Sequence, residues 1–212
     1  FMPSLREIST KELMRLWNQY SIQSMQALFT SLGVELEAVR EYLVRHELPP
    51  EEVITYPWQD KRVQALFADE EFLDCMEAER DQKRALLRSY CEERALNGAE
   101  EEIAIVDIGW RGTIQDNLCH LFPKTKMLGF YIGLIPFLNE QPANAEKRGY
   151  IDAFRSARAL MTVSTPFEMI CNSPNGSTVG YSAKDGKIVA LRNCEQEEDA
   201  IFFSYTKALQ KH

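Results

Sequence analysis

The residues best suited to chemistry lie in one stretch, residues 107–115, which reads Asp-Ile-Gly-Trp-Arg-Gly-Thr-Ile-Gln. Asp107 follows an apolar run, and a carboxylate in that position can act as a general base, a metal ligand or an acceptor for a sugar hydroxyl. The alternative is a structural aspartate that accepts backbone N–H bonds from the following turn. The planar guanidinium of Arg111 suits a phosphate or a carboxylate, although a surface salt bridge is the commoner role of a lone arginine. The stretch is therefore a candidate binding loop.

The remaining residues of this stretch would shape the loop. Gly109 and Gly112 let the backbone bend sharply and approach a ligand, but any tight strand-to-helix turn needs such glycines, and neither a Walker loop nor GxGxxG is matched. Trp110 would pack on the core or on a ligand ring, and we favour the core. Thr113 is expected as a helix N-cap. Gln115, early in that helix, would add a polar contact or lie on the surface.

Two further ionisable side chains could belong to the site. Glu168 lies between apolar neighbours, where a charge needs a partner, so it joins Asp107 as a candidate catalytic residue. His120 has no Cys, Ser or Asp at telling spacing, and we interpret it as a structural imidazole. The sequence contains no recognisable nucleophile–base pair and no metal-ligand cluster.

The elements that would position these residues form a βαβ unit. An apolar run ending at Val106, a glycine-bearing turn over residues 108–113, an amphipathic helix and a second apolar run from Met127 to Leu134 follow one another. Open α/β sheets bind ligands at the carboxyl ends of their strands, where the next helix presents unpaired N–H groups. We therefore predict a small Rossmann-like sheet with the site at that edge.

Residues 1–98 are predicted to be mainly helical. Ser9 and Glu12 have the form of a capping box, and the apolar positions that follow keep helical spacing as far as Gly33. A second helical segment ends before a pair of prolines. Asp69 is placed to cap a long charged helix that would run to about Leu96.

Residues 99–212 are predicted to form the α/β part, and we expect both parts to pack as one globular unit. After the βαβ unit, residues 136–149 are interpreted as a loop, residues 150–153 as a short strand and residues 156–170 as a helix. Apolar runs on either side of Asp185-Gly186 predict a β-hairpin, and residues 195–211 a closing amphipathic helix. The predicted fold class is α/β: a helical N-terminal half, a small sheet, and a C-terminal hairpin and helix.

Composition excludes several classes of function. The chain has 212 residues and a net charge of −8, with no concentrated basic face, so a nucleic-acid partner is not expected. Five widely separated cysteines without a CxxC pair indicate a reducing, cytoplasmic setting rather than a disulfide frame or a zinc site. No apolar run reaches the roughly 18 residues of a membrane span, and no signal peptide is visible. Because the chain starts at Phe1 without an initiator methionine, we expect a piece of a longer protein.

Three segments together resemble one known family. They are Phe1-Met-Pro-Ser-Leu5, Val106-Asp-Ile-Gly-Trp-Arg-Gly-Thr-Ile-Gln115, and Phe167-Glu-Met-Ile170 with Gly176-Ser177 and Gly180-Tyr181. The first is similar to the end of a Ser-Arg-Arg…Leu-Pro-Ser-Leu segment. Together they resemble the region downstream of the hydrolase domain in large bacterial haloacid-dehalogenase-like proteins, which are linked with glycosyltransferases and surface-polysaccharide synthesis.

This resemblance implies an accessory α/β module whose upstream domain, in the same polypeptide, carries the chemistry of a hydrolase or glycosyltransferase. Hydrolases of that superfamily need a strand ending in Asp-x-Asp. Here Gly109 stands two positions after Asp107, and no other Asp-x-Asp exists in the chain. The resemblance therefore places the phosphatase machinery outside these residues and leaves their own activity open.

Our leading hypothesis is binding of a phosphate-bearing molecule or a sugar nucleotide over residues 107–113. Thr113 and the N–H groups at the helix start would meet the phosphate, Arg111 would add charge, and Asp107 would bind a hydroxyl or a divalent cation that accompanies the ligand. The rival hypothesis is a non-catalytic scaffold module that docks a neighbouring domain or a partner protein. A transferase that uses Asp107 or Glu168 as its base is a third possibility.

Overall fold

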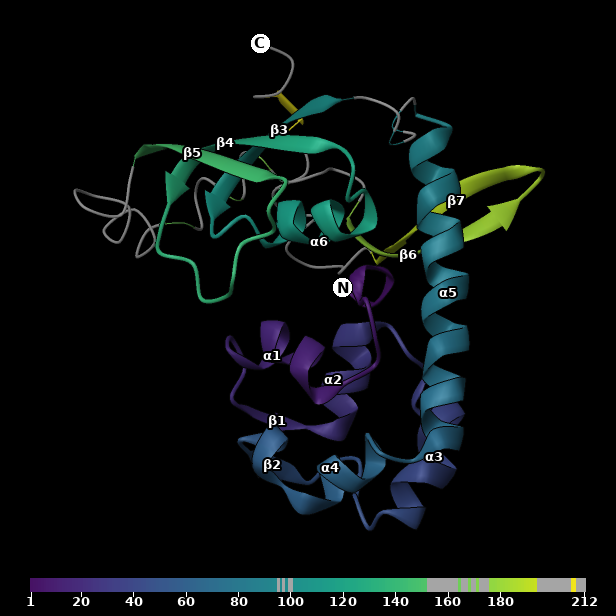
Figure 1. The fold of residues 1–212 in the computed structure, drawn as a ribbon. Helices are drawn as coiled ribbons and strands as arrows, with labels where there is room; N and C mark the ends of the chain where they lie inside the picture. Colours follow the sequence, from purple (N-terminus) through teal and green to yellow (C-terminus); the bar gives the residue numbers. More distant parts are fainter. Residues whose placement is uncertain are drawn as a thin grey trace. The chain divides into compact units, whose positions relative to one another are not determined.

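The computed structural model describes residues 1–94, 96, 98, 101–151, 164, 168, 171, 176–193, 207 and 208 (Figure 1). The chain divides into two compact units. Unit 1 comprises Phe1–Leu87 and Leu138–Glu140, and unit 2 comprises Arg88–Phe137 and Gln141–His212. The predicted α/β class is confirmed, with a helical N-terminal half, a parallel sheet and a C-terminal hairpin.

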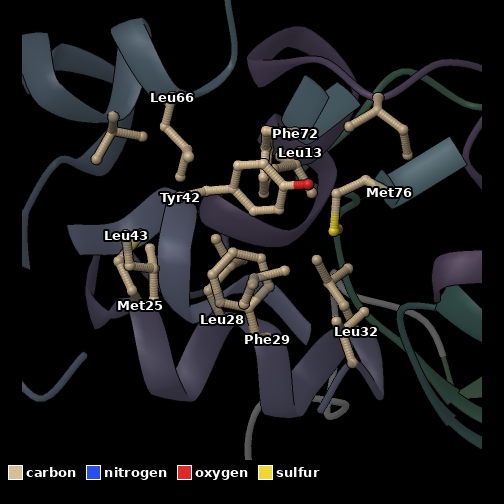
Figure 2. Close-up of a cluster of buried hydrophobic side chains, with 14 of the residues drawn as sticks. Leu13, Met25, Leu28, Phe29, Leu32, Tyr42, Leu43, Leu66, Phe72 and Met76 are labelled. Carbon is tan, nitrogen blue, oxygen red and sulfur yellow. The ribbon is translucent and has the colours of Figure 1, made fainter. Parts of the chain in front are cut away.

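The elements of the N-terminal half are mostly helical. They are η1 (Met2–Ser4), α1 (Thr10–Trp17), β1 (Ile22–Ser24), α2 (Met25–Leu32), α3 (Leu36–Arg45), β2 (Val53–Thr55), η2 (Pro57–Gln59), α4 (Lys61–Leu66) and α5 (Glu70–Glu92). Their apolar faces form one core in unit 1, built around the fully buried Trp17, Phe29 and Phe72. Figure 2 shows how side chains from several of these helices meet in this cluster.

The prediction of one continuous helix as far as Gly33 is wrong, because α1 ends at Trp17 and the chain then forms strand β1. Residues of β1 pair antiparallel with β2, and the Ser24 hydroxyl oxygen accepts the N–H of Ala27 at 3.2 Å, which caps a new helix, α2. Gly33 does end that helix in a left-handed conformation, with φ 67°, as its sequence position indicates.

Two predicted helix starts are present in unit 1. The Ser9 hydroxyl oxygen accepts the N–H of Glu12 at 3.2 Å, although the Glu12 carboxylate accepts the N–H of Arg6 rather than completing the capping box. The Asp69 carboxylate accepts the N–H groups of Glu71 at 3.1 Å and Phe72 at 3.4 Å. Asp69 thus caps α5 as predicted, and this helix ends at Glu92 rather than near Leu96.

The βαβ unit is present in unit 2. Strands β3 (Glu102–Trp110), β4 (Lys126–Leu134) and β5 (Ala145–Ile151) form a parallel sheet in the order β3-β4-β5, and α6 (Thr113–Leu121) connects the first two. Helix α6 covers one face of this sheet (Figure 1). The carboxyl ends of the three strands therefore lie at one edge, where the β3–α6 turn also lies.

The loop predicted over residues 136–149 is too long, because most of strand β5 lies within that range. The strand begins at Ala145 and ends at Ile151, so the short strand expected over residues 150–153 is the end of a longer one. Its alternate residues point to the α6 side and to the opposite side of the sheet. Charged residues in the strand obscure that alternation in the sequence.

The C-terminal hairpin is confirmed as β6 (Ser177–Lys184) and β7 (Lys187–Asn193). Asp185 and Gly186 form its two-residue turn with φ 51° and 74°, the geometry that favours these residue types. The helices expected over residues 156–170 and 195–211 lie mostly outside the described residues; Ser164, Glu168, Lys207 and Ala208 are helical. Within the described part of the chain, no helix is long and apolar enough to cross a membrane.

Candidate functional site

Strand β3 is longer than its apolar run predicts. Gly109 pairs with Gly133 and Trp110 with Leu134, so the expected turn over residues 108–113 is wrong and only Arg111 and Gly112 join β3 to α6. A Cβ on Gly109 would lie 2.3 Å from the carbonyl oxygen of Gly133. Gly109 is therefore needed for close approach of two strands rather than for a loop.

The turn leaves the start of α6 without a side-chain cap. Gly112, in the left-handed region with φ 67°, is the N-cap residue, and no side chain accepts a hydrogen bond there. Thr113 is the first helical residue, so its expected role as N-cap is wrong. The first N–H groups of a helix have no intrahelical acceptor and carry partial positive charge. The α6 N-terminus is therefore a place where an anion can bind.

Asp107 lies within β3, where it pairs with Tyr131 of β4, and is half-buried; the expectation that it closes the strand is wrong. Its Oδ1 atom accepts the N–H of Ile108 at 2.7 Å, which is the local backbone bond expected of a structural aspartate. Its charge also reaches Tyr131 on β4. Burial raises the pKa of the Tyr131 hydroxyl above its usual range, and the negative charges of Asp107 and Asp116 raise it further.

Arg111 and Trp110 each make one contact that the sequence does not predict. Nη1 of Arg111 donates to the carbonyl oxygen of Pro136 at 2.5 Å, which ties the β3–α6 turn to the segment after β4. The indole Nε1 of Trp110 donates to Oε1 of Glu168 at 3.1 Å. Trp110 is half-buried, so it is not enclosed in a core. Glu168 is exposed, so its charge does not depend on this partner as its apolar neighbours in the sequence suggested.

Gln115 is fully buried and faces the sheet. Its amide nitrogen donates to the carbonyl oxygens of Met127 at 2.9 Å and Glu146 at 3.1 Å, and its oxygen accepts the hydroxyl of Tyr131 at 2.5 Å. These bonds use the amide inside the protein. The expectation that Gln115 touches a ligand does not fit this position, and its role is to hold α6 on the sheet.

Lys147 on β5 was missed by sequence reasoning. Its side chain is 3% exposed, and its Nζ atom lies 2.6 Å from Oδ1 of Asp116 in α6. Nζ also donates to the carbonyl oxygen of Arg111 at 3.0 Å and to Oε1 of Gln141 at 2.7 Å. The signal that could have found it is the alternation Ala145, Lys147, Gly149, Ile151, which places a lysine on the buried side of a strand.

Other polar groups of α6 face away from the turn or are chemically quiet. His120 lies in the last turn of the helix, at the opposite end from Gly112. Burial raises the pKa of the Cys119 thiol to about 11, and the nearby Asp116 carboxylate acts in the same direction. A thiol with so high a pKa is a poor nucleophile at neutral pH.

The described residues around the start of α6 show no nucleophile–base pair. Within the described residues, no group of three or more His, Cys, Asp and Glu side chains is arranged to hold a metal ion. Comparisons of the chain with models of known protein families and with characterised proteins find no match.

Proposed function

We propose that this chain is an accessory α/β module of a larger bacterial surface-polysaccharide biosynthesis protein, haloacid-dehalogenase-like and glycosyltransferase-associated, and that it binds a phosphate-bearing or sugar-nucleotide ligand over residues 107–113. The ligand site is carried by one observation: α6 begins at the carboxyl edge of a parallel sheet with no capping side chain. The parent protein is proposed from the sequence resemblance alone.

Arg111 and Asp107 would bind different parts of the ligand. A guanidinium has five N–H donors, and the bond to Pro136 engages one nitrogen of Arg111, so the group can also meet a phosphate oxygen. Asp107 would repel a bare phosphate, but its carboxylate can accept a sugar or ribose hydroxyl or hold a divalent cation that arrives with the ligand. This division favours a ligand with both a phosphate and a hydroxyl-bearing sugar.

The proposal concerns binding and assigns no hydrolysis. Gly109 occupies the position at which the resembling hydrolases need their second aspartate, and it is engaged in close strand pairing with Gly133. Asp107 and Glu168 remain the candidate catalytic residues of the described part of the chain. Glu168 accepts the indole N–H of Trp110, a contact that would position it and supplies no proton-relay partner.

Thermal-shift titrations with inorganic phosphate and with UDP-glucose test the proposal. A ligand at one hundred times its Kd should stabilise the protein by about 2.7 kcal/mol. Arg111→Ala should abolish the shift with both ligands, whereas Arg148→Ala, at an exposed arginine of β5 in the same unit, should leave it unchanged. If neither ligand shifts the wild-type protein, the ligand-binding proposal is wrong.

The Asp107→Asn variant distinguishes recognition of the sugar from recognition of the phosphate. Asparagine keeps an oxygen that can accept the Ile108 N–H, so the local turn is retained while the negative charge is removed. We expect weaker binding of UDP-glucose and equal or tighter binding of inorganic phosphate. Equal losses for both ligands would show that Asp107 does not read the sugar.

A second candidate, an interaction module, is favoured by the open face of the sheet. Parallel sheets are usually covered on both faces, yet Val106 is 84% exposed and Tyr150 91% exposed on the face away from α6. The partner that we propose for this exposed face of the sheet is the upstream domain of the same polypeptide. Val106→Glu with Tyr150→Glu should then weaken association with the separately purified upstream domain and leave phosphate binding intact. Unchanged association would exclude this role.

A further inference from the structure

The ammonium group of Lys147 is enclosed in unit 2 by acceptors from three different segments. They are the Asp116 carboxylate in the first half of α6, at 2.6 Å, the Arg111 carbonyl in the β3–α6 turn, at 3.0 Å, and the Gln141 side-chain oxygen in the β4–β5 connection, at 2.7 Å. An ammonium has three N–H donors. Two of them donate to the Arg111 and Gln141 oxygens, and the Asp116 carboxylate forms an ion pair with the group, which together offset the cost of burying the charge.

The β3–α6 turn contacts Lys147 directly. A Cβ on Gly112 would lie 2.9 Å from Cε of Lys147 and 2.6 Å from the hydroxyl of Tyr131. On its other side, Nζ lies 4.5 Å from the ring centroid of Phe137, which precedes Gln141 in the β4–β5 connection. Lys147 thus contacts both segments that border the start of α6 at the carboxyl edge of the sheet.

The charge of Lys147 matters as well as its shape. Asp116 lies in the first turn of α6, where its carboxylate would compete with an incoming anion for the positive end of the helix. The ion pair with Lys147 neutralises that carboxylate inside the protein. Asp116 would therefore add no unbalanced negative charge beside an anion at the uncapped N–H groups.

We propose that Lys147 is the positioning residue of the anion site. It holds the Arg111 carbonyl so that the turn keeps the α6 N–H groups open to the ligand, and it cancels the charge of Asp116 beside them. Lys147 does not touch the ligand, because its side chain is 3% exposed. This inference rests on the proposed function of the same site and adds the residue on which its geometry and charge depend.

The test compares Lys147→Met with Lys126→Met. Both lysines lie in the same sheet and pair with carboxylates, but Lys126 is half-exposed and pairs with Glu102 and Glu146 at the amino end of the strands. The backbone amide resonances of residues 111–115 are followed by ¹⁵N NMR, well below the unfolding temperature of each variant, during a titration with inorganic phosphate. We expect Lys147→Met to shift these resonances and to weaken phosphate binding about tenfold, and Lys126→Met to do neither.

The double variant Lys147→Met/Asp116→Asn keeps the test informative if Lys147→Met alone does not fold, because it removes both charges of a buried pair. Its turn amides should shift as well, since the Arg111 carbonyl loses its donor. Its phosphate affinity should fall less than that of Lys147→Met, because no unpaired carboxylate remains beside the helix start.

A purely structural lysine would give a different result. Both Lys147 variants would then lose thermal stability while the folded protein kept wild-type turn resonances and wild-type phosphate affinity, and that outcome would overturn the proposal. If phosphate leaves the wild-type resonances unchanged, the proposed function fails. The shift of the turn amides between wild type and Lys147→Met still decides, on its own, whether Lys147 positions the turn.

Discussion

The hydroxyl of Tyr131 donates a hydrogen bond of 2.5 Å to the side-chain oxygen of Gln115, joining the middle strand of the sheet to the helix above it. The amide nitrogen of Gln115 donates in turn to a carbonyl oxygen of β4, from Met127, and one of β5, from Glu146. One buried side chain thus connects α6 to two strands. A fully satisfied buried amide of this kind fixes the helix in one position.

Tyr131→Phe should destabilise unit 2, because it leaves the Gln115 oxygen buried without a donor. The expected loss is about 1–3 kcal/mol, and Gln115→Leu should cost more, since it removes both bonds of the amide nitrogen and leaves the Tyr131 hydroxyl without its acceptor. Hydrogen exchange of the α6 amides in low concentrations of urea measures both. Tyr150→Phe is the matched control, because Tyr150 is 91% exposed. Equal exchange rates in Tyr131→Phe and Tyr150→Phe would contradict the role given to this bond.

The elements that the sequence predicts well are those specified by neighbouring residues. The apolar runs and the amphipathic helix between them identify the βαβ unit, and Asp185-Gly186 identifies the hairpin turn. Asp69 can be recognised as a helix cap because its carboxylate accepts hydrogen bonds from N–H groups only two and three residues further along the chain. In each case the physical cause lies within a few residues of the pattern.

The features that the sequence does not reveal depend on distant partners. Lys147 can lie inside a strand because Asp116, far away in the chain, supplies a counter-charge. Gln115 looks like a surface residue until β5 is known to pass beneath it. The apolar residues before and after Ser24 keep helical spacing, but they do not form one helix. The chain between them forms β1, which pairs with the distant β2, and Ser24 then caps a new helix.

Within the candidate site, residue types were easier to predict than their roles. Arg111 and Gly112 do lie at the carboxyl edge of the sheet, because a strand followed by a helix must place them there. Asp107 does not close the strand as expected, because β3 continues past it to Trp110 and Asp107 pairs with Tyr131 inside the sheet. The exact extent of β3 could not be predicted. It depends on the contact between Gly109 and Gly133, two glycines from different strands that pair closely.

Gly112→Ala should destabilise unit 2 more than Gly186→Ala does. Both glycines have positive φ, 67° and 74°, so each substitution carries a backbone cost of about 1–2 kcal/mol. Only Gly112 has neighbours in the way: its added Cβ would lie 2.6 Å from the Tyr131 hydroxyl, whereas nothing lies within 4 Å at Gly186. Overpacking adds about 1–3 kcal/mol. Urea unfolding followed by hydrogen exchange of α6 should show the difference, and equal losses would mean that the turn can move away from Tyr131.

Asp69 should make the stability of unit 1 fall at acid pH. The hydrogen bond to His46 is the largest cause that holds the pKa of this carboxyl below its usual range; burial opposes it, and the N–H of Phe72 and the guanidinium of Arg45 add to it. A carboxyl with a depressed folded pKa stabilises fully above its unfolded pKa, about 3.9, and this contribution is lost as pH falls through the folded value.

Asp69→Asn isolates that charge, because asparagine keeps an oxygen to cap α5. Its Tm should lie below that of the wild type at pH 6, and the gap should begin to narrow below about pH 4 and close once pH falls below the depressed folded pKa, where the wild-type carboxyl is neutral too. Asp74→Asn, at an exposed aspartate of the same helix, is the control and should follow the wild-type Tm at every pH. A gap between Asp69→Asn and wild type that stays constant down to pH 2 would mean that the cap stabilises through geometry, with no contribution from the charge.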